Sequence, residues 1–208
     1  IDIHEETTAI LPSKEWKEAR FKESWWPGDT ISVGIGQGYW TATPIQIANA
    51  TNILVNRGIN HPPHLVQVAK KEDQITQLNN EEKPPVVLNN EDNWRIAIDA
   101  MHNTVKKTTG TAHRAFKGAT YDPAGKTGTA QVVSIAQGER YDADALKERQ
   151  RDNAIYIGFA PFNNPQIVVS IVVENTGGGS SVGAPIARQL MDYYFAANPI
   201  QPSGDKAP

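Results

Sequence analysis

Hydrophobic positions follow a helical period in the segment between residues 43 and 58. Thr43 has the side chain of a helix N-cap, and Pro44 suits the first helical position. Gly58 supplies a stop signal at the other end. One face of this segment carries the apolar residues Ile47, Ala50 and Leu54. The pattern predicts an amphipathic helix between the two signals.

Two later segments show the same period. Residues 92–107 predict a helix that ends before Gly110. Its apolar stripe consists of Trp94, Ile98, Met101 and Val105. The glycines at 177–179 lead into a final helix with Pro185 near its start. Ile186, Leu190 and Tyr193 are expected to lie along one face of this helix.

The N-terminal part of the chain has a less regular pattern. Residues 16–26 mix aromatic and basic side chains, and they predict a short helix or irregular segment before a turn at Pro27-Gly28. Three glycines then fall within five positions, which predicts a tight loop or a close backbone approach at Gly34, Gly36 and Gly38. Residues 65–69 are expected to form a strand, and the polar stretch 71–90 a surface hairpin or loop.

Three β-strand signals dominate the second half of the chain. They cover residues 124–133, 154–160 and 167–174, and a charged insert at 138–152 separates the first from the second. The short connection "PFNNP" indicates a hairpin between the last two strands. The sequence therefore predicts an α+β fold, in which helices pack on an antiparallel three-stranded sheet.

Composition narrows the possible functions. The 208 residues are enough for one sizeable domain with a core, and 39% of them are hydrophobic. A net charge of −3 gives no electrostatic reason to expect a nucleic-acid partner. The absence of cysteine excludes disulfides, thiol catalysis and cysteine-ligated metals within this chain. No apolar run is long enough to span a bilayer.

The candidate chemistry lies in "KTGT", residues 126–129, at the head of a predicted strand. Lys126 offers a positive charge for a substrate carboxylate, and the hydroxyls of Thr127 and Thr129 can hydrogen-bond the same group. Gly128 lets another segment pack closely on the backbone. A strand edge also exposes N–H groups, which can pair with an extended peptide or point at a developing oxyanion.

Two other interpretations of this stretch stay open from the residues alone. Lys126 can be a solvated lysine at an ordinary strand start. "GKT" also ends the phosphate-loop pattern, but that pattern needs glycine where Thr120 stands, and a helix after the lysine. Gly128 and the Val132-Val133 pair favour a strand instead.

Four segments in one order give the motif a family context. They are "GIGQGYWTATPIQIANA" from Gly34, "GTAHRAF" from Gly110, "GKTGTAQV" from Gly125 and "IGFAPFNNPQIVV" from Ile157. Together they closely resemble the class B penicillin-binding proteins of the penicillin-binding protein 2 group, the transpeptidases of rod-shape elongation in Gram-negative bacteria. The resemblance extends over residues 1–196 and is most specific in the first of these segments.

The resemblance implies the penicillin-binding transpeptidase fold and a serine-type DD-transpeptidase. Such enzymes cross-link peptidoglycan by acyl transfer from D-Ala-D-Ala stem peptides, and β-lactams acylate them. It implies that Lys126 and Thr127 bind the substrate or β-lactam carboxylate. It implies that the backbone N–H of Thr129 completes the oxyanion hole, that its hydroxyl faces the carboxylate, and that Gly128 keeps the strand surface open. It implies no cofactor and no metal.

Two further motifs of this family, S-x-x-K with the nucleophilic serine and S-x-N, are expected upstream of this segment. The only S-x-x-K present is Ser203 to Lys206, in a Pro/Gly-rich tail where a catalytic helix is implausible, and no S-x-N occurs. We therefore interpret residues 1–198 as the C-terminal part of a transpeptidase domain and 199–208 as a mobile tail. This chain alone is expected to be inactive.

The resemblance also implies partners and a location. For the full-length protein these are peptidoglycan stem peptides, β-lactams, a membrane glycosyltransferase and scaffold proteins of the elongation machinery. The location is the periplasmic face of the inner membrane, with an N-terminal transmembrane anchor outside this chain. Two rival functions share the fold: a catalytically inactive substrate-binding or pedestal module, and a serine β-lactamase.

For the other candidate residues, the sequence favours a structural role over a role in a site. A surface loop is favoured over a metal site for His61 and His64, and a structural role over a cleft role for His113. For the aromatic residues, core packing or loop anchoring is favoured over lining a peptide groove; they are Trp25, Trp26, Tyr39 and Trp40. The insert at 138–152 is expected to be a solvated loop or short helix, with a substrate-contacting lid as the alternative. Residues 177–181 are expected to be a helix-entry loop, with the cleft rim as the alternative.

Overall fold

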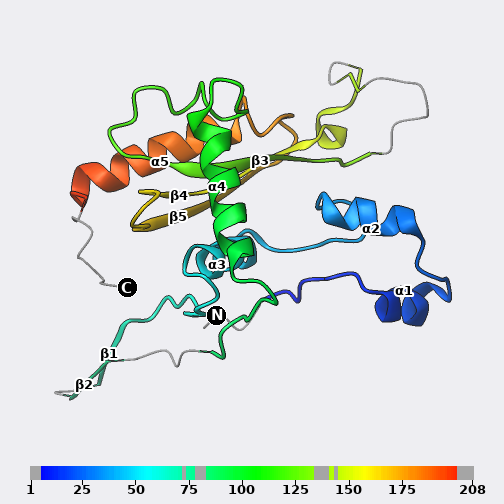
Figure 1. The fold of residues 1–208 in the computed structure, drawn as a ribbon, viewed down its shortest axis with the longest axis horizontal. Coiled ribbons are helices and arrows are strands. Elements are labelled where there is room, and N and C mark those ends of the chain that lie inside the picture. The colour runs from blue at the N-terminus through cyan, green and yellow to red at the C-terminus, as the bar shows by residue number, and fades with distance from the viewer. Residues whose placement is uncertain (1–5, 72–73, 78–82, 134–140, 143–144, 201–208) are drawn as a thin grey trace.

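The protein combines five α-helices with two antiparallel sheets in the part of the chain that the structure describes. This computed structural model describes residues 6–71, 74–77, 83–133, 141–142 and 145–200. The elements that surround the "KTGT" segment are the helices α3 (Pro44–Val55), α4 (Asp92–Lys106) and α5 (Gly183–Ala197) and a three-stranded sheet (Figure 1). The α+β architecture expected from the sequence is confirmed.

The central sheet has the strand order β3-β4-β5 and is antiparallel throughout. Its strands are β3 (Ala124–Ala130), β4 (Asn153–Ala160) and β5 (Ile167–Val173). All three predicted strands are therefore present, although the first ends at residue 130 rather than 133. Among the described strands, β3 pairs only with β4, so it forms one edge of this sheet.

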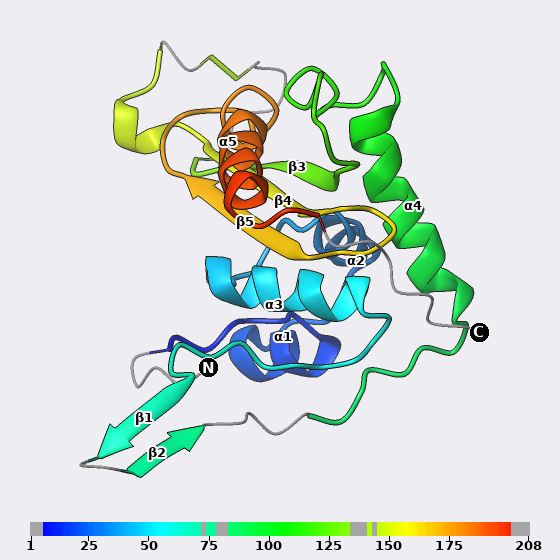
Figure 2. The same ribbon diagram turned by 90° about the vertical axis from the view of Figure 1, so that its left-hand side faces the viewer.

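Helices cover both faces of the central sheet, and each face has its own core. Figure 2 shows α5 on one side of the sheet and α3 on the other. The α5 side contains the fully buried Tyr156 and Met191, and the opposite side contains Phe159, packed with Met101 of α4 and Leu54 of α3. The sheet is thus fixed from both faces, which makes β3 a rigid support.

The helix α3 begins and ends as the sequence predicts. The Thr43 hydroxyl accepts a hydrogen bond from the Gln46 backbone N–H, and the Gln46 side chain accepts one from the Thr43 N–H. This reciprocal capping box satisfies two donors at the helix start. After the helix ends, Gly58 has φ +97°, which favours glycine. In α4 the predicted stripe is confirmed, since Trp94, Met101 and Val105 are buried.

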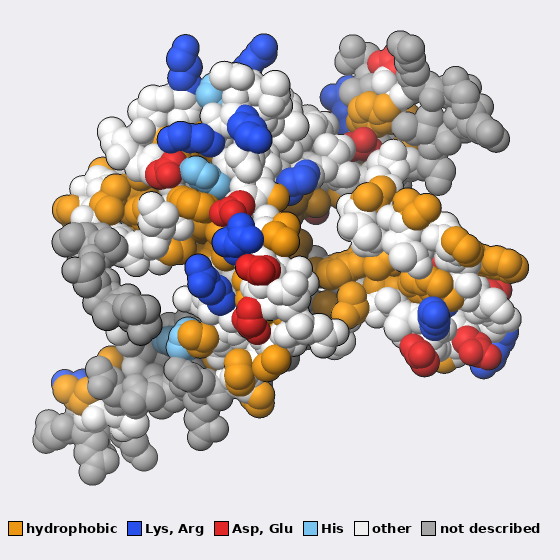
Figure 3. All heavy atoms as spheres, in the orientation of Figure 1, with side chains coloured by type: hydrophobic (Ala, Val, Ile, Leu, Met, Phe, Trp, Pro, Cys, Tyr) orange, Lys and Arg blue, Asp and Glu red, His pale blue; other side chains and the backbone are white. Residues whose placement is uncertain are grey.

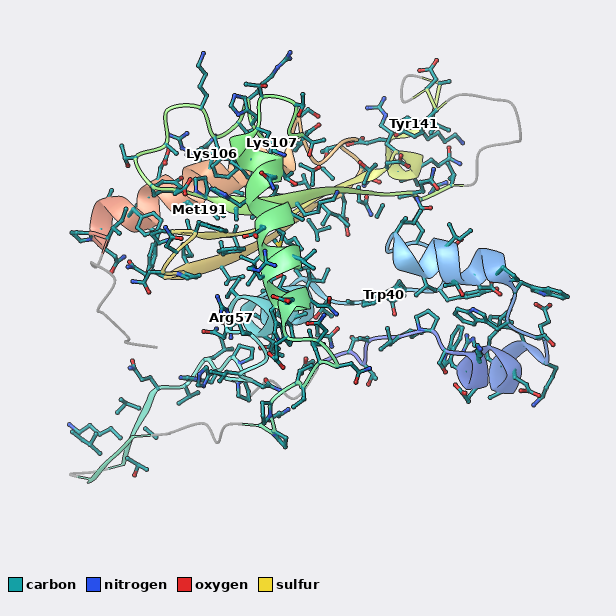
Figure 4. All side chains as sticks on the ribbon, viewed as in Figure 1. Trp40, Arg57, Lys106, Lys107, Tyr141 and Met191 are labelled. Carbon is teal, nitrogen blue, oxygen red and sulfur yellow. The ribbon has the colours of Figure 1, made fainter. Side chains whose placement is uncertain are left out.

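The apolar residues predicted to share one face of α5 are not its buried residues. Leu190 and Tyr193 are exposed, Tyr193 at 80%, while the buried positions are Ala184, Ala187 and Met191. The small alanine side chains let the helix approach the sheet closely, while Leu190 and Tyr193 face away from it. Met191 fills the space between α5 and the sheet (Figure 4).

The turn predicted at Pro27-Gly28 is also wrong, because Pro27 is the first residue of helix α2 (Pro27–Gly34). Helix α1 (Lys14–Phe21) precedes it, as expected. The two helices are joined by an ion pair in which the Lys17 ammonium lies 2.7 Å from an Asp29 carboxylate oxygen. Lys17 is only 3% exposed. This hydrogen bond raises the pKa of Lys17 and lowers that of Asp29.

A separate two-stranded sheet projects from the rest of the fold (Figures 1 and 2). Its strands are β1 (Val68–Lys71) and β2 (Gln74–Gln77), which form an antiparallel hairpin. The strand predicted at 65–69 therefore starts three residues later, and the hairpin expected within 71–90 is present in part. Within the described residues, no helix is long and apolar enough to cross a membrane.

Candidate functional site

The "KTGT" segment lies on the free edge of the central sheet, where its side chains alternate between the two faces. Lys126 pairs with Ile157 of β4, and Thr127 pairs with Tyr156. Thr127 is 9% exposed, whereas Lys126 and Thr129 are exposed. The alternation places Thr127 and Thr129 on the α5 side, where only Thr127 is buried, and places the exposed Lys126 on the opposite side.

Thr127 takes part in two hydrogen bonds at the strand edge, one with Lys126 and one with Thr111. The Lys126 ammonium donates to the backbone carbonyl oxygen of Thr127 at 2.6 Å. The hydroxyl oxygen of Thr127 lies 2.8 Å from that of Thr111, in the segment that follows α4. A positive charge and a partnered hydroxyl thus lie next to each other on an unpaired strand edge, an arrangement suited to an anionic group.

The two glycines of the motif strand, Gly125 and Gly128, differ in the space around them. A Cβ on Gly125 would overlap the Tyr156 hydroxyl and would lie 2.7 Å from the Ile157 carbonyl oxygen. A Cβ on Gly128 would meet only Ile155, at 3.3 Å from its Cβ. Gly125 therefore makes room for a buried ring, while Gly128 leaves its side of the strand nearly open.

The loop before α5 packs directly on the backbone of the central sheet. A Cβ on Gly179 would overlap the carbonyl oxygens of Gly128 and Ile155, so only glycine fits there. The Gly177 N–H also donates to the carbonyl oxygen of Asp152, at 2.9 Å. This helix-entry loop is consequently fixed against the strand that carries the motif.

A groove continues from the C-terminal end of β3. It has a volume of about 310 Å³ and is lined by Ala130 to Val133 on one side and by residues 36–38 and Trp40 on the other. The Gln37 amide lies 3.5 Å from the Gln131 side-chain oxygen across it. Gly36 and Gly38 have φ near +80°, as the tight loop predicted there requires, whereas Gly34 is the last residue of helix α2.

The aromatic candidates divide between the groove and local packing. Trp40, from the connection between α2 and α3, lines the groove (Figure 4). Tyr39 packs on Trp16 and Phe21 instead. The Trp25 indole N–H donates to the Thr30 hydroxyl. Hydrophobic side chains are also exposed over α2 in Figure 3, where Ile31, Ile35 and the preceding Trp26 are each more than 60% exposed.

The histidine candidates lie away from the motif or in structural contacts. His113 has its Nδ1 atom 3.0 Å from the Val105 carbonyl oxygen, which ties the turn to the end of α4. His61 lines a cavity of about 250 Å³ between α3 and the start of β5. No group of three or more potential metal ligands comes together in the described ranges.

Sequence reasoning gave no role to two side-chain groups near the motif. The first is Thr111, which lies inside the quoted segment "GTAHRAF" but has no local signal for a contact sixteen residues away. The second is His102 of α4, whose Nε2 atom lies 3.0 Å from both Asp122 carboxylate oxygens. Lys106 approaches the same carboxylate at 3.4 Å, and the His102 ring stacks on Phe162. This cluster fastens α4 to the segment that enters β3.

Part of the charged insert lies outside the described residues, namely 138–140 and 143–144. In the described part, Glu148–Gln150 form a short 3-10 helix. The Asp152 backbone N–H donates to the Tyr141 hydroxyl at 2.9 Å. The short helix expected there is thus present next to β4.

The chain is similar to one protein family over most of its length. Residues 1–192 match the family described as the penicillin-binding protein transpeptidase domain. Peptidoglycan D,D-transpeptidase MrdA of Haemophilus influenzae is 46% identical over 201 residues. The Escherichia coli K12 protein of the same name is 44% identical over 195 residues. Each match covers 94% of this chain but only about 30% of the relative, so the chain spans less than a third of their length.

Solved structures show the same similarity. The Pseudomonas aeruginosa PBP2 in complex with WCK 5153 superposes with a TM-score of 0.79 and 35% identity, over 100% of this chain and 43% of that one. The fold of Helicobacter pylori PBP2 in complex with MreC superposes with a TM-score of 0.77 at 24% identity, over 95% of this chain and 33% of that one. The resemblance inferred from the four sequence segments is confirmed, and the chain belongs to the family of penicillin-binding protein transpeptidase domains.

Proposed function

We propose that this chain supplies the carboxylate-binding strand of a serine-type peptidoglycan D,D-transpeptidase. The observation that carries the proposal is the edge strand β3, where the Lys126 ammonium donates to the Thr127 carbonyl oxygen and the Thr127 hydroxyl is paired with that of Thr111. Relatives named as D,D-transpeptidases, similar over 94% of the chain, support the reaction class. The substrate is the D-Ala-D-Ala end of a stem peptide.

Each motif residue has a role in this proposal. Lys126 and Thr127 bind the terminal carboxylate of the stem peptide, or the equivalent carboxylate of a β-lactam. The Thr129 backbone N–H donates to the oxyanion that forms on the scissile carbonyl, and its hydroxyl faces the carboxylate. Gly128 leaves the strand surface accessible, in agreement with the single contact that a Cβ would make there. The extended peptide then lies along β3 as an added strand.

The nucleophile of the reaction belongs to the sequence that precedes this chain in the full-length protein. A serine oxygen attacks the scissile carbonyl carbon, the C–N bond to the terminal D-alanine breaks, and that amine leaves with a proton. The amine of a second stem peptide then displaces the serine. The S-x-x-K at Ser203 to Lys206 lies outside the described residues, in the proposed tail. Residues 1–198 form the C-terminal part of the transpeptidase domain.

The proposal includes partners and a location for the full-length protein. The PBP2 of Helicobacter pylori was solved in complex with MreC, which supports a scaffold protein of this kind as a partner. A membrane glycosyltransferase of the elongation machinery is a second partner of the full-length protein. The site works at the periplasmic face of the inner membrane, and a transmembrane anchor precedes this chain.

Intact-mass spectrometry with excess β-lactam tests the proposal. We expect the full-length protein to gain the mass of one drug molecule, and the isolated 208-residue chain to gain none. Acylation of the isolated chain contradicts the divided site, because the nucleophile would then lie within it. A full-length protein that gains no mass supports the rival function, an inactive substrate-binding module. Rapid release of hydrolysed drug instead indicates a serine β-lactamase.

A further inference from the structure

The contact between Thr111 and Thr127 joins the motif strand to a turn that is itself rigid. This turn follows α4 and is fixed by two backbone hydrogen bonds, from Gly110 N–H to the Lys107 carbonyl and from Ala112 N–H to the Thr104 carbonyl. Ala112 is fully buried. A Cβ on Gly110 would overlap the Thr104 carbonyl oxygen, so the turn wraps tightly around the helix end. The Thr111 hydroxyl is therefore held at a fixed place beside β3.

Hydrogen-bond chemistry fixes the direction of this contact when an anion binds. Two hydroxyls 2.8 Å apart share one hydrogen, and in the free protein either can donate it. A carboxylate only accepts, so a Thr127 hydroxyl that binds it must donate its own hydrogen to it. The hydrogen between the two threonines must then come from Thr111. Donation by Thr111 also polarises the Thr127 hydroxyl and strengthens its hydrogen bond to the anion.

We propose that Thr111 is a positioning residue that orients the Thr127 hydroxyl as a hydrogen-bond donor to the carboxylate of the substrate. The inference rests on the proposed function and adds to it a residue that does not touch the substrate. Lys126 supplies charge with little direction, since an ammonium group can present any of its three N–H donors to an anion. The Thr111–Thr127 pair supplies direction, and the hydrogen bond that Thr127 then donates is stronger to a charged carboxylate than to a neutral ester at the same position.

The experiment measures β-lactam acylation of the full-length protein and its Thr111→Val variant. The probes are benzylpenicillin, which has a free carboxylate, and benzylpenicillin methyl ester. Because a hydrogen bond to a charged group is lost or misdirected, we expect the second-order acylation rate with the free acid to fall about tenfold. The rate with the ester changes less than twofold. The ratio of the acylation rate with the acid to the rate with the ester therefore falls. A general loss of structure would lower both rates and leave this ratio unchanged.

Three further variants separate positioning from structure. Thr111→Ser keeps the hydroxyl and restores the rate to within about threefold of the wild type. Thr109→Val makes the same chemical change two residues away in the turn and leaves the rate unchanged. In a Thr127→Val background, adding Thr111→Val has no further effect if Thr111 acts through Thr127. Should Thr111→Val unfold at the assay temperature, Thr111→Ala replaces it in the same comparison.

Each outcome bears on one of the two proposals. The inference is overturned if Thr111→Val acylates like the wild type, if it slows acid and ester equally, or if its effect adds to that of Thr127→Val. In all three cases the wild type is still acylated, and the proposed function stands. A wild type that no β-lactam acylates overturns the proposed function itself, and the inference with it.

Discussion

Replacing Gly125 by alanine tests whether the glycine before Lys126 serves packing rather than chemistry. The added Cβ would overlap the hydroxyl and the ring carbon of Tyr156, and would lie 2.7 Å from the Ile157 carbonyl oxygen. Tyr156 is fully buried and its ring stacks on Phe116. The carbonyl belongs to the neighbouring strand β4. Neither neighbour is the free end of a flexible side chain, so the overlap can be relieved only if the buried ring or the strand backbone moves.

The loss of folding free energy on this substitution can be estimated from the groups that the new Cβ displaces. Overpacking a filled core costs about 1–3 kcal/mol. We place Gly125→Ala near the upper end, at about 3 kcal/mol, because a buried ring and strand backbone must both shift. With about 2 °C lost per kcal/mol in a domain of 150–250 residues or more, the melting temperature falls by about 6 °C.

The assay is thermal unfolding of the full-length protein, with Gly128→Ala as the matched control. That Cβ would meet Ile155 at 3.3 Å, a contact that a shift of a few tenths of an ångström relieves. Alanine also lowers the entropy of the unfolded chain, which offsets the small strain. We expect Gly128→Ala to melt within about 1 °C of the wild type. Equal melting temperatures for the two variants would refute the argument.

Three further predictions concern ionisable groups. The hydrogen bond from Lys17 holds the pKa of Asp29 below its ordinary 3.8. The ionised Asp29 therefore stabilises the folded protein above pH 3.8, and this contribution to stability is lost as the pH falls below 3.8 and the carboxylate becomes protonated. Asp29→Asn should flatten the acid limb of a melting-temperature profile; an unchanged limb contradicts this. Burial raises the pKa of Tyr121 and Tyr156, so stability falls as pH rises above 10, and ultraviolet absorbance should show these tyrosinates forming only on unfolding. Tyr121→Phe removes a 2.8 Å hydrogen bond to Asp192 and should lower the free energy of unfolding by about 1–2 kcal/mol in urea titrations.

Local signals in the sequence predicted the elements that local chemistry determines. The Thr43 cap and Pro44 fixed the start of α3 because their hydrogen bonds and φ angle act within one helical turn. Pro27 shows the limit of this reasoning, since proline suits a turn and a first helical residue equally well. In α5, hydropathy favoured Leu190 and Tyr193, but the closeness of helix and sheet selected smaller side chains.

The candidate site was predictable only as far as the motif itself. Lys126 to Thr129 were found because a family pattern marks them, and β3 was expected from the β-branched run that follows. The hydroxyl partner at Thr111 depends on how α4 and its turn pack beside β3. That placement depends on contacts between residues far apart in the sequence, and a hydrophobic pattern read over a short stretch of sequence does not reveal such contacts. The fit of Gly125 under Tyr156 is likewise a property of the strand register.

The free edge of β3 also affects how the protein behaves while it folds. An edge that can accept an extended peptide can also accept the same edge of a second copy, which is a route to aggregation. A lysine on such an edge opposes this pairing, because two copies would bring like charges together. Lys126 thus opposes self-association during folding, in addition to the recognition role proposed for it. Under that proposal, a loss of function at this position has two physical origins, weaker anion binding and self-association of nascent chains.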